Sequence, residues 1–297
     1  MINNKYPKIK FICAFFGEWP PWFDAFLISC KYNTDIEWLF FTDKAPPKNF
    51  PSNISFINGD LNKFSELATQ KLNLKVKVTK PYKICDFKLS YGLIFEDYLK
   101  TYDFWGMCDI DVIFGNIKKI ITNDMLMHND IISSRKELIA GHFTLFKNCR
   151  RINNLFKEMN HHKKVLESDQ KIGNFVEAEI TEHLKKHKYK YKIKWDQWLV
   201  NFPQEMPIEA FYDCNGNLPS KLDKSSSTIC AREGAWLMIK PLPNCNWEWR
   251  KGNLFVNDKE ILYLHFKNWK GTLKNINFNY EDDVDSFNIN HVRINKS

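Results

Sequence analysis

The sequence predicts an α/β protein with a mostly parallel central sheet flanked by helices. Over roughly the first 110 residues, short apolar runs typical of buried strands alternate with segments whose apolar residues recur at helical spacing. Such alternation is typical of strand–helix–strand units. The 297 residues, 44% hydrophobic and 26% charged, suffice for a full core and lie near the globular average. This composition excludes a disordered, fibrous or disulfide-stapled miniature protein.

The elements of the first part follow one another in order. A helix is expected at residues 60–72, where Asp60 fits an N-cap because its side chain can accept from a free backbone N–H group. The other helices expected here span residues 22–32 and 82–100. The strands expected here span residues 8–16, 36–42, 54–57 and 103–111.

The remainder is less regular. We expect strands at residues 131–132, 142–146, 228–232, 236–239 and 261–266, and helices at 152–159 and 175–187. No internal repeat or low-complexity linker divides the chain, so we expect one domain over residues 1–274. Residues 275–297 are rich in Asn and Asp without a clear period, and we expect a partly mobile tail there.

Composition also limits the cellular setting and the partners. The first residues lack a long apolar region and no apolar run reaches membrane-spanning length, so we expect neither a secretory leader nor a transmembrane helix. The 8 cysteines include no C-x-x-C pair, so we expect reduced, buried thiols of a cytosolic protein rather than a zinc ribbon. A net charge of +8 with 15% aromatic residues suits anionic partners or sugars, without choosing between them.

The chemical centre of the sequence is a pair of carboxylates. Asp109 and Asp111 stand two apart in an extended apolar run, so both side chains are expected on one side of the chain. Buried like charges need a compensating cation, and ligands of open α/β sheets bind at the carboxyl ends of strands. The pattern therefore predicts a Mg²⁺ or Mn²⁺ site for a diphosphate, the alternative being two surface aspartates in a turn.

A histidine near the far end supports this site. His265 ends an apolar strand and is followed by Lys267 and Lys270. Imidazole is a common metal ligand, Mn²⁺ accepts mixed oxygen and nitrogen ligands, and lysines hold phosphate as point charges. The alternative is a core histidine with satisfied hydrogen bonds.

These features resemble GT-A glycosyltransferases. The late His-Phe-x-x-x-Lys element is similar to the H-F-x-G-x-x-K-P-W signature of glycosyltransferase family 8, although Asn268 replaces the glycine, Lys270 falls one place early and no proline follows it. The N-terminal half more closely resembles a bacterial GT-A-like family carried mainly as a domain of unknown function. The matching stretches lie at residues 16–20, 26–30, 80–88, 102–115 and 141–148.

The resemblance implies a nucleotide-binding half at residues 8–115, an acceptor half at 116–274, and a role for each matching residue. Phe16 and Gly17 would meet the base, Asp43 the base or ribose, and Asp86 and Lys88 the ribose and phosphate. Further roles fall to the metal ligands Asp109, Asp111 and His265, the donor-sugar contacts Gly141, His142 and Asn148, and the catalytic or acceptor residue Glu177.

Each role has a plainer alternative. Phe16 can be ordinary core, and one of Asp86 and Lys88 can be solvated, because residues two apart do not share a helix face. Val176 replaces an aspartate of the relatives, so Glu177 can be a solvated helix residue; Asp169 is the other candidate base.

A basic stretch suggests a further contact. Residues 185–195 alternate lysine with Tyr, Ile and Trp, which as a strand would separate the two kinds of side chain onto two faces. This predicts either an edge strand protected by lysine or peripheral contact with an anionic membrane. No base-reading motif is present, so we expect no nucleic acid partner.

Together these expectations describe a metal-dependent glycosyltransferase, with Asp109, Asp111 and Glu177 in the catalytic roles. It would move a hexose from a nucleotide diphosphate sugar, a UDP-sugar above all, to a glycan or lipid-linked glycan in bacterial surface polysaccharide synthesis. Mn²⁺ or Mg²⁺ would be the cofactor, and the family 8 link favours retention. The alternatives are a nucleotidyltransferase, which the loop at residues 16–20 counts against, and a non-catalytic carbohydrate- or nucleotide-binding protein.

Overall fold

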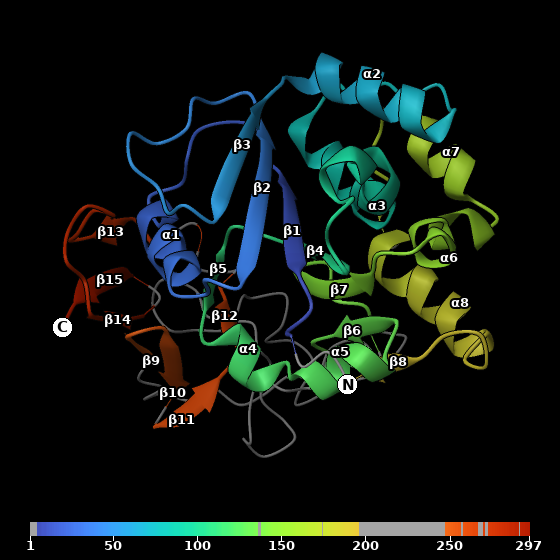
Figure 1. Cartoon of the computed structure of the whole chain (residues 1–297). Coiled ribbons are helices and arrows are strands. Elements are labelled where there is room, and N and C mark those ends of the chain that lie inside the picture. The colour runs from blue at the N-terminus through green and yellow to red at the C-terminus, as the bar shows by residue number, and fades with distance from the viewer. Residues whose placement is uncertain are drawn as a thin grey trace, which may run out of the picture.

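A computed structural model of the chain describes residues 5–135, 138–173, 175–195, 247–256, 258–266, 270, 273–290 and 292–297. Its centre is a seven-stranded sheet in the order β3-β2-β1-β4-β7-β6-β8 (Figure 1). Only β7 runs antiparallel to its neighbours in this sheet, which confirms the expected mostly parallel arrangement. The strands are β1 (Ile9–Ala14), β2 (Ile36–Thr42), β3 (Ile54–Asn58), β4 (Phe104–Cys108), β6 (Ile131–Ser133), β7 (Phe143–Lys147) and β8 (Ile193–Trp195).

Helices cover both faces of this sheet, as expected. One apolar cluster joins a sheet face to α2 (Leu61–Leu72), α3 (Tyr91–Ile94), α6 (Arg150–Asn153), α7 (His162–Glu167) and α8 (Ile180–Lys186). A second cluster joins the other face to α1 (Phe23–Lys31), α4 (Ile117–Ile120) and α5 (Asn123–His128). The expected cap of α2 is confirmed, because the Asp60 carboxylate accepts from the backbone N–H of Lys63 at 2.8 Å.

The helix expected at residues 82–100 is instead three short pieces. They are a 3₁₀ helix η1 (Pro81–Ser90), then α3, then a 3₁₀ turn η2 (Glu96–Tyr98). In a 3₁₀ helix residues three apart lie directly above one another. This places the ammonium of Lys83 3.0 Å from the carboxylate of Asp86, with both side chains buried. The tighter helix thus aligns the two charged side chains.

A second sheet contains the C-terminal segment where we expected a partly mobile tail. Its order is β11-β10-β9-β14-β15-β13, so strands from both sides of residue 274 share one sheet. Alternate residues such as Trp247, Trp249, Phe287 and Ile289 are buried. The sequence analysis did not predict strands from this period of two. The strands are β9 (Trp247–Arg250), β10 (Asn253–Val256), β11 (Lys259–Ile261), β13 (Asn275–Ile276), β14 (Ser286–Ile289) and β15 (Arg293–Lys296).

The basic stretch at residues 185–195 is not the continuous strand we expected. Helix α8, which follows a π-helical turn η4 (Phe175–Glu179), runs to Lys186, and only Ile193–Trp195 is a strand. The alternation fails because Tyr191 is buried with its hydroxyl on Glu158, whereas Tyr189 is 78% exposed. Two further segments expected as strands, residues 228–232 and 236–239, lie outside the described residues.

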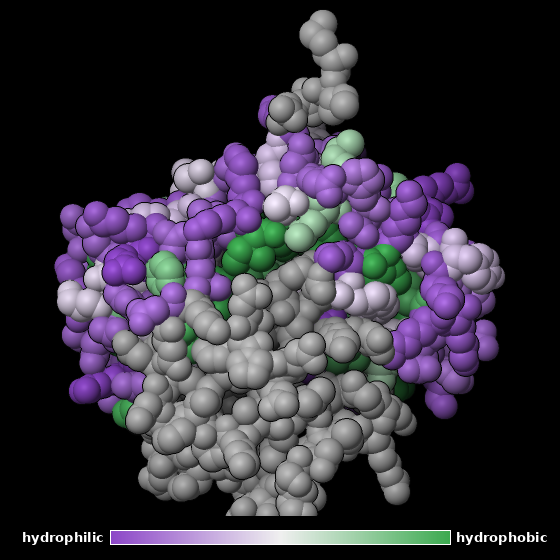
Figure 2. Space-filling view, turned by 90° about the horizontal axis from the view of Figure 1, so that it is seen from below, coloured by the Kyte–Doolittle hydropathy of each residue, from purple (hydrophilic) through white to green (hydrophobic). Residues whose placement is uncertain are grey.

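The described residues on the face shown in Figure 2 are mainly polar and surround a central group of hydrophobic ones. Within the described ranges, no helix combines the length and apolar character needed to cross a membrane. No disulfide joins the five cysteines in these ranges; three of them are buried, as expected, and Cys85 and Cys149 are partly exposed. The buried ones are Cys13, Cys30 and Cys108.

Candidate active site

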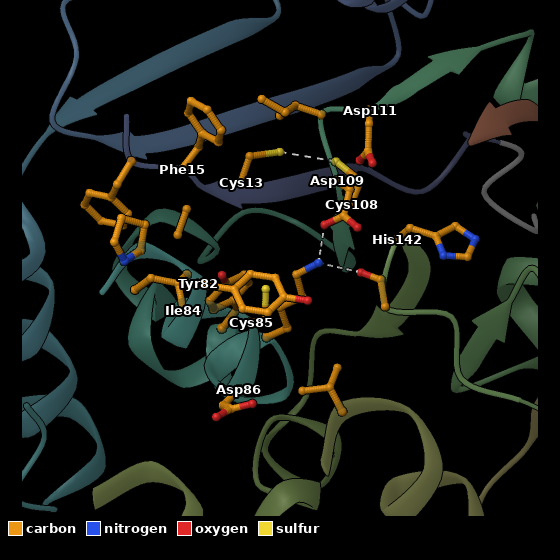
Figure 3. Close-up of a pocket in the computed structure, with 18 of the residues that line it drawn as sticks. Cys13, Phe15, Tyr82, Ile84, Cys85, Asp86, Cys108, Asp109, Asp111 and His142 are labelled. Atoms are coloured by element: carbon orange, nitrogen blue, oxygen red, sulfur yellow. Dashed lines mark hydrogen bonds and ion pairs between the residues drawn. The ribbon is translucent and has the colours of Figure 1, made fainter. Parts of the chain in front are cut away.

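A pocket of about 400 Å³ opens where β1 and β4 end (Figure 3). Its walls come from segments far apart in the sequence: the ends of these two strands, the helix η1, the loop before β7, the turn η4, and Lys270. Ligands of open α/β sheets bind at the carboxyl ends of parallel strands. The pocket therefore lies where the topology predicts a binding site.

Asp109 and Asp111 lie in a bend at the floor of this pocket. We expected them to extend the fourth strand, but β4 ends at Cys108 and the next strand, β5 (Val112–Phe114), belongs to a different sheet. The indole N–H of Trp22 donates to the carbonyl of Ile110 at 3.0 Å and holds the bend. The Asp111 side chain is only 2% exposed and that of Asp109 35% exposed. The bend thus presents one buried and one accessible carboxylate.

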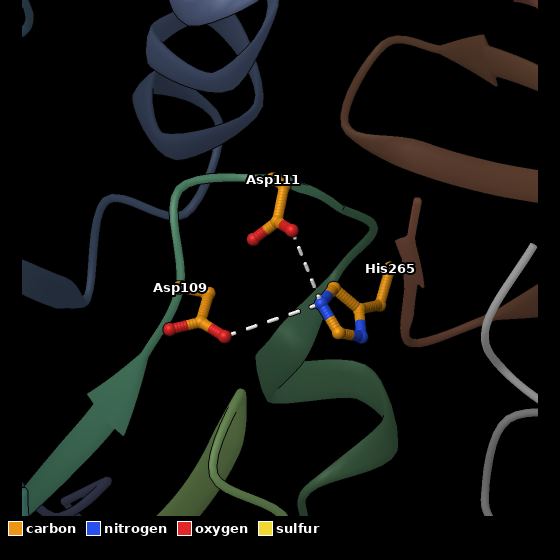
Figure 4. A group of neighbouring side chains, drawn as sticks. All are labelled: Asp109, Asp111 and His265. Atoms are coloured by element: carbon orange, nitrogen blue, oxygen red, sulfur yellow. Dashed lines mark ion pairs between the residues drawn. The ribbon is translucent and has the colours of Figure 1, made fainter. Parts of the chain in front are cut away.

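His265 reaches these carboxylates through strand pairing. Strand β12 (Tyr263–His265) pairs antiparallel with β5, so that His265 lies opposite Val112. Its Nε2 is 3.4 Å from Asp111 Oδ2 and 4.0 Å from Asp109 Oδ2 (Figure 4). His142 stacks on the His265 ring, with centroids 4.1 Å apart and planes at 20°.

The donor set fits a divalent metal ion. One ligand atom from each of Asp109, Asp111 and His265 lies within 4.8 Å of the other two. Two carboxylate oxygens and one imidazole nitrogen suit Mn²⁺, which accepts mixed oxygen and nitrogen ligands. A buried carboxylate such as Asp111 also favours cations around it, because a buried charge is costly unless it is compensated. The three residues expected to hold a metal are thus the ones that converge.

Two lysines flank the cluster. Lys88 Nζ contacts Asp109 Oδ1 and donates to the carbonyl of Gly141 at 2.8 Å, and Lys270 Nζ lies 2.6 Å from Asp111 Oδ2. Burial alone would lower the pKa of Lys88, but the charges of Asp109, Cys85 and Tyr91 and the hydrogen bond to Asp109 together outweigh burial and raise that pKa. Burial would likewise raise the pKa of Asp111, yet the charges of His265 and Lys270 hold it well below its usual range. The site therefore keeps ionised groups at its floor.

Gly141 and Glu177 form the opposite wall. The backbone N–H of Gly141 donates to Glu177 Oε1 at 3.1 Å, while its carbonyl accepts from Lys88. A Cβ at position 141 would lie 3.0 Å from the same Glu177 oxygen, so the glycine permits this close approach. Glu177 is thus bound into the pocket wall rather than solvated at a helix surface.

The remaining predicted residues divide into three groups. Phe16 and His142 line the pocket, although Phe16 is also core, with its ring 6.0 Å from that of Phe41. Gly17 and Asp43 do not line it: the Gly17 N–H donates to Asp43 Oδ1 at 3.0 Å in the loop beyond β1. Lys267 lies outside the described residues.

The structure shows Asp86 in a protein contact that the sequence did not suggest. Asp86 lines the pocket, but its Oδ2 accepts from Lys83 Nζ at 3.0 Å and from the backbone N–H of Ile172 at 2.8 Å. Asp86 and Lys88 are 2% and 8% exposed, so neither is the solvated residue that we kept as an alternative. Asn148, expected near the donor sugar, instead donates to the carbonyls of Leu99 and Tyr102.

Several pocket residues were not predicted from the sequence. Cys13 and Cys108 lie side by side at the ends of β1 and β4, with their sulfurs 3.2 Å apart, and Cys85 lines the η1 wall. At the rim, the ammonium of Lys171 lies 3.7 Å from the centre of the Tyr82 ring. The two strand-end cysteines could have been found from their position alone, whereas Tyr82 and Lys171 carry no pattern in the sequence that marks them.

Three solved structures to which this chain is similar are glycosyltransferases. The galactosyltransferase LgtC with donor and acceptor sugar analogues is 12% identical, with a TM-score of 0.33, over 63% of this chain and 72% of LgtC. Mouse xyloside xylosyltransferase 1 is 9% identical, with a TM-score of 0.35, over 64% of this chain and 78% of that enzyme. GlyE of Streptococcus pneumoniae TIGR4 is 10% identical, with a TM-score of 0.31, over 65% of this chain and 45% of GlyE.

Sequence comparison gives a closer assignment. No curated protein matches the chain. One family model, described as a family of unknown function (DUF6625), matches residues 11–297, which is nearly the whole chain. This agrees with the expected membership of a family carried as a domain of unknown function. The chain therefore belongs to the DUF6625 family.

Proposed function

We propose that this protein is a metal-dependent glycosyltransferase that moves a hexose from a nucleotide diphosphate sugar, a UDP-sugar above all, to a hydroxyl of a glycan. The observation that carries the proposal is the convergence of Asp109, Asp111 and His265 at the floor of a strand-end pocket. A hard cation held there by carboxylates and imidazole suits a diphosphate, whose oxygens are the ligands that such a cation prefers.

Asp109, Asp111 and His265 would hold Mn²⁺ or Mg²⁺. When bound, the ion would offset the negative charge that develops on the departing diphosphate. The chain's own cations add to this, because Lys88 and Lys270 contact the two carboxylates and lie within reach of the same region. The exposed ring of Tyr82 gives apolar surface for the nucleoside, and Phe16 lines the pocket next to the core.

We assign Glu177 to the acceptor side of the reaction. It faces the pocket beside Gly141 and is fixed by the hydrogen bond to that residue's N–H group. A positioned carboxylate can accept the proton of an attacking hydroxyl, as a general base must. The resemblance to family 8 favours retention of the anomeric configuration, in which case Glu177 orients the acceptor instead of deprotonating it.

The proposed setting is the cytoplasmic side of the membrane, in the assembly of a bacterial surface glycan such as a capsule or lipopolysaccharide. Exposed lysines gather at the end of α8 and in the turn that follows, beside the exposed Tyr189. Each lysine near an anionic lipid surface contributes about 1 kcal/mol of attraction. A lipid-linked acceptor would reach the protein at this lysine-rich surface. The lysines are Lys185, Lys186, Lys188, Lys190 and Lys192.

Calorimetric titration with UDP tests the proposal. The wild-type protein should bind UDP in MnCl₂ and much more weakly in EDTA, and Asp111→Asn should lose the metal-dependent part. Asp35→Asn is the matched control, since it removes an equal charge from an exposed pair with Lys118. UDP binding that is indifferent to both the metal and Asp111→Asn would refute the metal site. Hydrolysis of a panel of nucleotide sugars, followed by NMR, would then identify the donor and the product anomer.

A further inference from the structure

The two lysines of the site contact its carboxylates in different ways. Lys88 contacts Oδ1 of Asp109, whereas the oxygen of Asp109 that faces His265 is Oδ2. Lys270 contacts Oδ2 of Asp111, the same oxygen that faces His265. Lys88 therefore leaves Asp109 Oδ2 available to another cation, whereas Lys270 already contacts Asp111 Oδ2.

A metal ion and Lys270 would thus compete for one carboxylate. Lys270 Nζ is 2.6 Å from Asp111 Oδ2, a full contact ion pair, and His265 Nε2 is 3.4 Å from that atom. An ion bound between Asp109, Asp111 and His265 would have to share this oxygen with the ammonium or displace it. Two cations at one carboxylate oxygen repel each other at short range, and the repulsion is strong at a buried site.

Lys270 can leave this contact more easily than Lys88. Half of the Lys270 side chain is exposed, while that of Lys88 is 10% exposed and also donates to the Gly141 carbonyl. A lysine carries a compact charge on a flexible stem, so its ammonium can move to a new anion without backbone movement. A diphosphate bound to the same metal would place such an anion beside it.

We propose that Lys270 is a tethered counter-ion that competes with the divalent metal for Asp111 and moves to the diphosphate when both ligands are present. The inference rests on the proposed function and adds a property to it. Each ligand therefore raises the affinity of the protein for the other. The diphosphate draws Lys270 away from Asp111, and this removes the competition between Lys270 and the metal. Coupling of this kind is reciprocal and typically changes each affinity by about 5–150-fold.

Lys270→Gln separates this competition from general electrostatics. The control is Lys171→Gln, which removes the same charge from the same pocket at a lysine that pairs with the Tyr82 ring. Mn²⁺ affinity is measured by calorimetry and by the paramagnetic resonance signal of free Mn²⁺, with and without UDP. Circular dichroism checks that each variant is folded, which is expected because both side chains are at least half exposed or at the rim.

The expected result has two parts. Lys270→Gln should bind Mn²⁺ alone about tenfold more tightly than the wild type, and UDP should then raise its Mn²⁺ affinity by a much smaller factor. Lys171→Gln should change Mn²⁺ affinity alone by less than about twofold, because it touches neither carboxylate.

Three results would overturn the inference. They are weaker Mn²⁺ binding in Lys270→Gln, equal gains in the two variants, or an unchanged effect of UDP on Lys270→Gln. A wild-type protein that binds neither Mn²⁺ nor UDP would instead refute the proposed function, and the inference with it. The two failures are therefore distinguishable in one set of titrations.

Discussion

Replacing Lys83 by Met should destabilise the protein strongly, because it leaves a buried carboxylate without its cation. The side chains of Lys83 and Asp86 are 1% and 3% exposed, and their charged atoms are 3.0 Å apart. Lys83 Nζ also donates to the carbonyls of Val165 and Gln170, at 2.5 and 3.0 Å. The substitution therefore removes one ion pair and two further hydrogen bonds at once.

The size of the effect follows from burial. Breaking a buried ion pair by removing one partner costs about 3–5 kcal/mol, since the remaining charge is left uncompensated. The control is Lys71→Met, because Lys71 pairs with Glu96 and Asp97, whose side chains are about half exposed. Exposed pairs contribute about 0–1 kcal/mol. The two substitutions are chemically identical, so the difference between them isolates the burial of the charge.

Urea denaturation followed by circular dichroism and tryptophan fluorescence measures both variants. We also expect Lys83→Met with Asp86→Leu to recover part of the loss, because the double variant buries no charge. A difference of less than about 1 kcal/mol between Lys83→Met and Lys71→Met would refute the reasoning. It would mean that the buried contact between Lys83 and Asp86 contributes little to stability.

Two further predictions concern the pocket and the core beside it. Gly92→Ala should cost about 1–3 kcal/mol in urea denaturation, because its Cβ would lie 2.6 Å from the indole nitrogen of buried Trp105; unchanged stability would contradict this packing. Burial raises the pKa of the Cys85 thiol, so maleimide labelling of Cys85 should be slow at pH 7 and should speed up at alkaline pH. Because Cys85 lines the pocket, Mn²⁺ with UDP should slow this labelling, measured against Cys85→Ser, and labelling indifferent to both ligands would contradict its placement.

The first half of the fold is predictable because its signals are local. Strands β1 to β4 are apolar runs that the sequence marks directly, and Asp60 marks the start of α2. The position of Asp109 and Asp111 follows from the end of β4, since strand ends are where ligands of such sheets bind. Local pattern and general topology are therefore enough to place the two carboxylates in a pocket.

What the sequence could not predict depends on contacts between distant segments. The 3₁₀ form of η1 goes with a buried pair of charges whose other partners come from residues 165–172. The strands of the second sheet are two to four residues long, too short for a period of two to stand out. Residues 185–195 do not form the continuous strand that we expected, because the Tyr191 hydroxyl donates to Glu158 of another helix. In the first and last of these cases, a tertiary partner outweighed the local pattern.

The histidine of the site shows how narrowly such long-range pairing determines chemistry. His265 meets the carboxylates because β12 pairs with β5 in a register that sets it opposite Val112, next to Asp111, and the Phe266 N–H donates to the Asp111 carbonyl at 3.1 Å. A shift of one residue would turn the imidazole to the other face of the strand, since side chains alternate. That register is supported from the apolar side, where Leu264 and Ile113 pair and are both fully buried in the cluster that also contains the second sheet. The C-terminal sheet thus acts on the site indirectly: by packing against these two strands, it stabilises the pairing that brings His265, the third candidate metal ligand, to the two aspartates.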